Sequence, residues 1–148
     1  MFGTFFKSSL KALPVLVLLP VLSFFIYELT AEYFMFNIIL NISWLGGGVL
    51  VLMRISMIMA IVINFVFVMI IPSAMYGLDS GAKRKQFYLG FFLNILLMLV
   101  IPIFIHIRFG FESLALVILV GFSLLSFLIP FIIGAKLVTP AYKRVFWF

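Results

Sequence analysis

Residues 87–107 read FYLGFFLNILLMLVIPIFIHI and contain no aspartate, glutamate, lysine or arginine. A helix needs about 20 mainly apolar residues to cross the ~30 Å hydrocarbon core of a bilayer. Apolar and polar side chains do not alternate here, as they would in a strand of a membrane β-barrel. Because lipid offers no water to the backbone amides, these must bond within the segment. The stretch therefore predicts a transmembrane α-helix.

Similar apolar runs occur elsewhere in the chain, and we expect four spans, at residues 12–36, 49–75, 87–107 and 114–135. Of the 148 residues, 67% are hydrophobic and 9% are charged, whereas soluble domains carry about 25% charged residues. A soluble domain of this size could not bury so much apolar surface. The sequence predicts an all-α integral membrane protein, with four transmembrane helices in one compact bundle that forms a single domain.

The N-terminus also resembles a secretory signal peptide, because Lys7 and Lys11 precede the first apolar run. Cleavage after Ala31, however, would need a small residue where Leu29 stands. We therefore expect the first span to remain in the protein.

Basic residues gather on one side of the four-span arrangement. Eight of them, with Asp79, lie before the first span, between the second and third spans, and after the fourth. Cytoplasmic segments of membrane proteins carry an excess of Lys and Arg, so we expect both ends of the chain in the cytoplasm of a bacterial cell. These residues would contact anionic lipid headgroups. Since they sit at the edges of apolar runs, nucleic acid is not expected despite the net charge of +6.

Residues 33–53 leave the span count open, because they are apolar enough to cross a membrane by themselves. A five-span alternative needs a turn at Arg54 with almost no loop, and it places residues 83–85 opposite the N-terminus. In the favoured four-span interpretation, residues 37–48 lie along the outer interface or form a re-entrant segment. Glycines 46–48 would then interrupt the helix, since glycine is a weak helix former.

Each predicted span carries polar side chains, and these lie at a similar depth: Asn64, Asn94, Ser23, Ser123 and Ser126. Within the second span, Ser56, Ala60 and Asn64 share one helical face and would let another helix approach closely. Such groups usually join helices through hydrogen bonds, which contribute about 0.6 kcal/mol on average. The alternative interpretation is a polar site for a substrate or an ion.

Charged side chains near the outer ends of the spans predict ion pairs. Glu28 and Glu32 lie on one helical face, and Arg54 lies near the outer end of the second span. A charge among lipid tails is usually paired or reaches the headgroups, so we expect Arg54 to pair with a glutamate or to extend to the surface. Arg108 and Glu112 have the spacing of a local pair on the outer side.

The residues that would hold a metal or a cofactor are scarce. The chain has no cysteine and one histidine, His106, which excludes disulfides, thiolate metal sites and a multi-histidine site within one chain. His106 lies at the predicted membrane edge, where an imidazole is expected to bind water or headgroups. No phosphate-binding loop or Ser–His–acid set occurs, so we expect no catalytic residue, no metal and no cofactor.

Residues 77–86 form the only sizeable polar connection and contain Lys83, Arg84 and Lys85. We expect this segment to orient the protein and to contact lipid, with docking of a cytoplasmic partner as the alternative. The tail, residues 142–148, mixes basic and aromatic side chains and resembles an interfacial anchor.

These features predict a non-enzymatic membrane subunit of a larger membrane assembly, concerned with transport or export. Its partners would be other membrane subunits or copies of itself. The short loops leave little room for chemistry, and the small-residue faces suit helix partners. An autonomous small transporter or channel, built as a homo-oligomer, is the alternative, and an enzyme acting on lipid is a third hypothesis.

Overall fold

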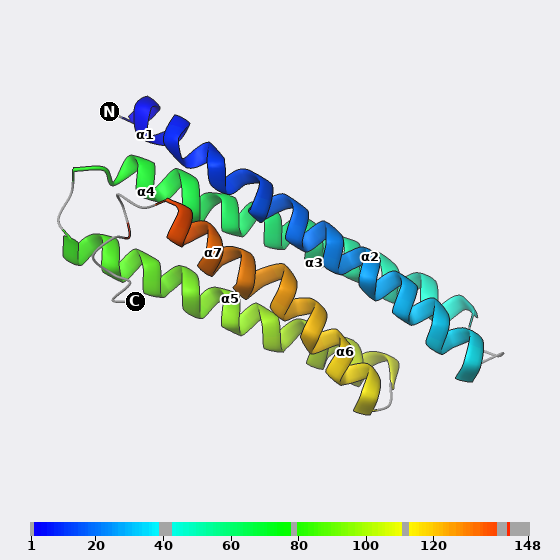
Figure 1. Ribbon diagram of the computed structural model, residues 1–148. Coiled ribbons are helices and arrows are strands. Elements are labelled where there is room, and N and C mark those ends of the chain that lie inside the picture. Colours follow the sequence, from blue (N-terminus) through cyan, green and yellow to red (C-terminus); the bar gives the residue numbers. More distant parts are fainter. Residues whose placement is uncertain (1, 39–42, 78–79, 111–112, 139–141, 143–148) are drawn as a thin grey trace.

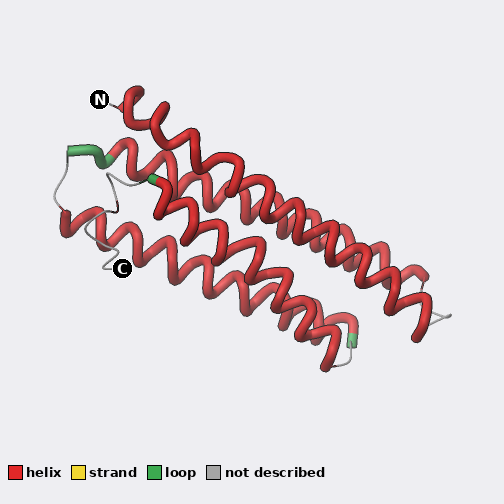
Figure 2. Tube along the Cα trace, in the orientation of Figure 1, coloured by secondary structure: helices red, strands yellow, loops and turns green. Residues whose placement is uncertain are grey.

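The computed structural model describes residues 2–38, 43–77, 80–110, 113–138 and 142, without the side chains of residues 31–38, 43–47 and 80. Figure 2 shows that helices make up nearly all of this described chain. The elements, in order, are α1 Phe2–Ser9, η1 Leu10–Ala12, α2 Leu13–Ile38, α3 Ser43–Phe65, η2 Val66–Ile70, α4 Ile71–Ala74, α5 Ser80–Phe109, α6 Ser113–Ser123, η3 Leu124–Leu128 and α7 Ile129–Leu137.

These elements join into four long helical runs that lie side by side, and α1 lies at the same end of the bundle as the last residues of α7 (Figure 1). We call this the terminal end, and the opposite end, with the α2–α3 and α5–α6 connections, the distal end. The run α6–η3–α7 contacts α2, α3 and α5, so it closes the bundle against all three other runs. Gly77 and Gly110 have positive φ angles, of 93° and 66°, and glycine adopts such angles without steric cost.

Four helical segments of the described residues are long and apolar enough to span a membrane: Phe2–Thr30, Gly48–Ala74, Gly81–Phe109 and Ser113–Leu137. The prediction of an all-α bundle with four transmembrane helices is therefore confirmed. Their outer faces are apolar, and on α5 the side chains of Phe92 and Ile107 are 64% and 76% exposed. Large apolar side chains exposed along whole helices are stable against lipid but not against water.

Residues 33–53, which left the span count open, belong to two different helices. Helix α2 continues to Ile38, and α3 begins at Ser43, so the five-span alternative is wrong. The re-entrant segment proposed for residues 37–48 is also corrected, because glycines 46–48 lie inside α3 and do not interrupt it. In lipid the backbone must keep its internal hydrogen bonds, which favours a continuous helix even through glycines. Residues 39–42 are outside the described chain.

The interior contains two separate apolar clusters. The terminal core consists of Phe5, Ala12, Leu16, Val68, Met69, Phe87, Phe131, Ala135, Val138 and Tyr142. The distal core consists of Phe24, Tyr27, Val49, Met53, Ile105, Leu119 and Phe122. Each cluster draws side chains from all four helical runs, so both ends of the bundle are held by aromatic and aliphatic packing.

Candidate functional site

Between the two cores lies a layer of buried polar side chains, which we call the central polar layer: Ser23, Ser56, Asn64, Asn94, Ser123 and Ser126. Along the run α3–η2, for example, Met53 of the distal core is followed by Ser56 and Asn64, and then by Val68 of the terminal core. The layer holds all five polar residues that the sequence singled out. Ser56, which the sequence assigned only to a small-residue face, is the additional member.

Two contacts in this layer join helices directly. Asn64 Nδ2 donates a hydrogen bond of 3.0 Å to the carbonyl of Phe127 in η3. The hydroxyl oxygens of Ser23 and Ser126 are 2.6 Å apart. Since Ser23 Oγ also donates to the carbonyl of Pro20 at 2.8 Å, the proton between the two serines comes from Ser126. The fourth helical run is thereby bonded to both α2 and α3 at mid-bundle.

The helices depart from α geometry next to these contacts. Segments η2 and η3 are π-helical, and each is followed directly by an Ile–Pro pair: Ile71–Pro72 and Ile129–Pro130. A proline within a helix lacks an N–H group, and its ring clashes with the carbonyl of the preceding turn. A π-helical turn widens the backbone there, which relieves this clash. Pro20 and Pro102, by contrast, lie inside α2 and α5 without a π-helical turn.

The first π segment leaves a carbonyl without its backbone donor. In an α-helix, Phe67 O would accept from the N–H of Ile71, but this N–H bonds to Val66 O instead. The next residue, Pro72, has no N–H to donate. The hydroxyl of Tyr142 supplies the missing donor, at 2.7 Å from Phe67 O.

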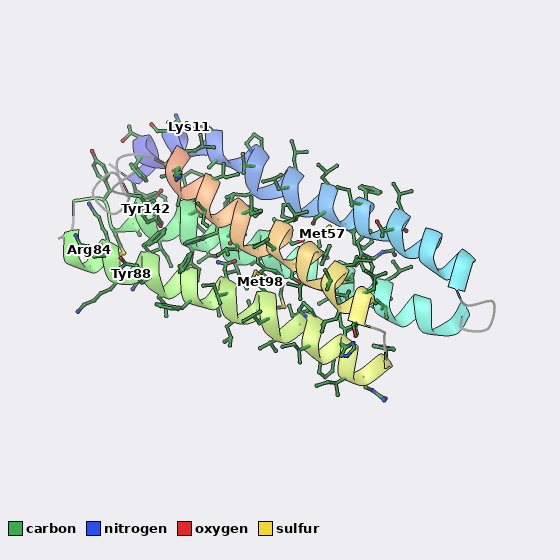
Figure 3. The ribbon with its side chains drawn as sticks, turned by 60° about the horizontal axis from the view of Figure 1, so that its bottom comes forward. Lys11, Met57, Arg84, Tyr88, Met98 and Tyr142 are labelled. Atoms are coloured by element: carbon green, nitrogen blue, oxygen red, sulfur yellow. The ribbon has the colours of Figure 1, made fainter. Side chains whose placement is uncertain are left out.

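Tyr142 therefore belongs to the terminal core rather than to a surface anchor. It is 3% exposed, and its ring meets that of Phe87 edge-on, with 5.3 Å between the centroids. Figure 3 shows it at the terminal end with Lys11 and Arg84. Burial raises the pKa of its phenol above the ordinary value. The prediction of an interfacial anchor is thus wrong for Tyr142, and residues 143–148 lie outside the described chain.

Near the distal end, the charged residue Arg54 contacts an aromatic ring. The Arg54 guanidinium carbon lies 5.8 Å from the centroid of the Phe24 ring, a cation–π contact. No ion pair between Arg54 and the half-buried Glu28 occurs among the described residues. The side chains of Glu32 and Glu112 lie outside the described part, so their pairing stays a prediction.

Two further groups near the helix ends are placed by the structure. Arg108 is exposed in the last turn of α5, and His106 Nδ1 is buried there without a hydrogen-bond partner in the described chain. At the terminal end, Lys83 is half-buried, whereas Arg84 and Lys85 are exposed near the start of α5. Within the described residues, no three His, Asp or Glu side chains gather as a metal site would require.

The apolar helices define the class of the chain as a multi-pass helical membrane protein. Comparison with protein-family models, curated proteins and solved structures finds no match. The function must therefore be argued from the chain's own residues.

Proposed function

We propose that the protein is a non-enzymatic integral membrane subunit of a larger membrane assembly, concerned with transport or export. The connections between its long helices are short: residues 75–79 join α4 to α5, and residues 110–112 join α5 to α6. Such connections hold no separate domain, so the chain offers its surroundings mainly helix faces and charged helix ends. We place it in a bacterial cytoplasmic membrane, with the terminal end in the cytoplasm as the positive-inside rule indicates.

The observation that carries this proposal is the charge at the start of α5. Lys83, Arg84 and Lys85 lie close to the N-terminus of this helix, and its first turn has no acidic residue. The helix dipole is positive at this end, so basic side chains there lower the stability of the helix. An acidic partner surface or phosphate headgroups would offset this cost.

Purification of the tagged protein from its native membrane in mild detergent tests the proposal. We expect a foreign membrane subunit in fixed stoichiometry, and we expect it to be lost when Lys83, Arg84 and Lys85 are all changed to Gln. The matched control changes Lys7 and Lys11 to Gln, since these lysines lie at the same end, and it should retain the subunit. A particle that contains only this chain would contradict the proposal.

A second candidate, an autonomous small transporter built as a homo-oligomer, is favoured by the central polar layer alone. Polar side chains inside a membrane are costly, and they can mark the pathway of a substrate or an ion. Reconstitution into vesicles followed by flux measurements tests this candidate. Flux that persists when Asn64 or Asn94 is replaced by leucine would show that the layer does not carry the transport.

A further inference from the structure

Asn64 and Asn94 each donate one hydrogen bond from the side-chain amide, and the amide oxygen of each accepts none from the described residues. Asn64 Nδ2 bonds to Phe127 O, and Asn94 Nδ2 bonds to Gly90 O at 2.8 Å. The Oδ1 atoms of both side chains are buried and accept no hydrogen bond from the described residues. Both side chains are 0% exposed, so neither lipid headgroups nor bulk water reach them in this conformation.

By residue count along their helices, the two amides lie at a similar depth in the bundle. Gly90 marks the close approach of α5 to its neighbours, because a Cβ atom there would lie 2.8 Å from the Phe67 ring and 3.0 Å from the Phe131 ring. Asn94 is one turn from Gly90 toward the distal end, and Asn64 is three residues from Phe67 in the same direction. At about 1.5 Å per residue, both are displaced by roughly 5–6 Å from this contact.

Two hydroxyls complete the set of partnerless oxygen atoms in the central polar layer. Ser56 Oγ and Ser123 Oγ are buried and have no hydrogen-bond partner among the described residues. Ser123 is one turn from Phe127, whose carbonyl binds Asn64, and Ser56 lies two turns from Asn64 on the same face of α3. The terminal and distal cores enclose these atoms from both ends.

The chemistry of these atoms selects the ligand. An amide oxygen only accepts hydrogen bonds, whereas a serine hydroxyl both donates and accepts. An anion would meet two amide oxygens and be repelled. A cation would leave the hydroxyl protons without an acceptor and would bury a charge in a layer that has no carboxylate. A neutral molecule that donates to Asn64 and Asn94 and accepts from Ser123 satisfies all three groups.

We propose that Asn64 and Asn94 form a binding site for water, the smallest neutral ligand with both donors and acceptors, between two apolar cores in the membrane. A buried water typically makes two to four hydrogen bonds, and Asn64, Asn94 and Ser123 offer three buried oxygen atoms that have no partner among the described residues. The site is independent of both functions considered above, since a subunit and a transporter could each contain it.

Water-edited solid-state NMR of the protein in lipid bilayers tests the site directly, because it follows magnetisation from water protons to individual carbons. We expect the side-chain carbonyl carbons of Asn64 and Asn94 to gain signal several-fold faster than the methyl carbons of Val68 and Leu16. These control residues are buried to the same degree but belong to the terminal core. Equal build-up at the amides and at the control residues would overturn the proposal.

Two further measurements identify the ligand and the residues that bind it. Asn94→Leu should slow the transfer to Asn64, whereas Met98→Leu, one turn farther along α5 (Figure 3), should leave it unchanged. Should Asn94→Leu fail to fold, the wild-type comparison alone decides. Replacing sodium by potassium, lithium or N-methylglucamine should not shift the amide signals. Signals that move with the cation would contradict a water site in favour of an ion site.

Discussion

Removing the hydroxyl of Tyr142 measures how much stability comes from its hydrogen bond to Phe67 O, a backbone carbonyl that lacks a donor within its own helix. Tyr142→Phe keeps the ring against Phe87 but takes the only donor that reaches Phe67 O in the described structure. The backbone cannot compensate, because the N–H of Ile71 is bonded to Val66 O and residue 72 is a proline.

Two energy ranges set the loss of stability that we expect for Tyr142→Phe. Leaving a buried acceptor unsatisfied costs about 1–3 kcal/mol, whereas hydrogen bonds between membrane helices average about 0.6 and reach about 1.7 kcal/mol. Because Phe67 O has no alternative backbone donor, we expect a loss of about 1–2 kcal/mol. A loss of 1.4 kcal/mol corresponds to a roughly tenfold change in the unfolding equilibrium constant.

Reversible unfolding in mixed detergent micelles, followed by circular dichroism, measures this loss. Tyr88→Phe is the matched control, because it removes the same atom from an exposed ring on α5, and we expect it to change stability by less than about 0.5 kcal/mol. If both variants lost the same stability, the assignment of Tyr142 as the donor for an otherwise unsatisfied carbonyl would be refuted.

Three other perturbations test separate parts of the packing. Burial raises the pKa of Tyr142 above its ordinary 10.0. Its stabilising contribution is therefore present below pH 10 and lost as the pH rises above it, and in a pH series of unfolding midpoints the decline should be smaller for Tyr142→Phe than for the unchanged protein. Gly90→Ala should destabilise the bundle by about 1–3 kcal/mol, because its Cβ would meet two phenylalanine rings, whereas Gly121→Ala, with nothing within 4 Å, should be neutral or slightly stabilising in the same assay. In a double-mutant cycle, Ser23→Ala and Ser126→Ala should show a coupling of about 0.6 to 1.7 kcal/mol, and additive losses would show that their hydroxyls do not interact.

The helical membrane class and the four spans could be predicted from the sequence because the physical constraint is simple. Lipid demands long apolar helices, and runs such as residues 87–107 meet that demand without ambiguity. The end of the first span was harder to locate, because residues 33–53 are mainly apolar and contain no charged residue. Glycines 46–48 suggested a helix break, but the requirement for internal backbone bonding in lipid outweighs the weak helix propensity of glycine.

The central polar layer was partly visible in the sequence, since depth along each span can be counted from its ends. The hydrogen-bond partners within the layer could not be predicted. Asn64 donates to the backbone carbonyl of Phe127, and every residue type has such a carbonyl, so the sequence does not single it out. The π segments could not be predicted from their Ile–Pro pairs alone, because Ile101–Pro102 lies inside α5 without a π segment. Tyr142 was missed because its neighbours, Lys143 and Arg144, give the tail the composition of a surface anchor.

The claim that the long helices cross the membrane in alternating directions, with the N-terminus and the α4–α5 connection on one side, is tested most directly by labelling single cysteines, since the protein has none of its own. Gly3→Cys and Tyr76→Cys probe the terminal end, and Ser113→Cys probes the distal end, with an impermeant maleimide applied to intact cells. We expect Ser113→Cys to react, and Gly3→Cys and Tyr76→Cys to react only after the membrane is opened. Reaction of Tyr76→Cys from the same side as Ser113→Cys would contradict the four-span arrangement.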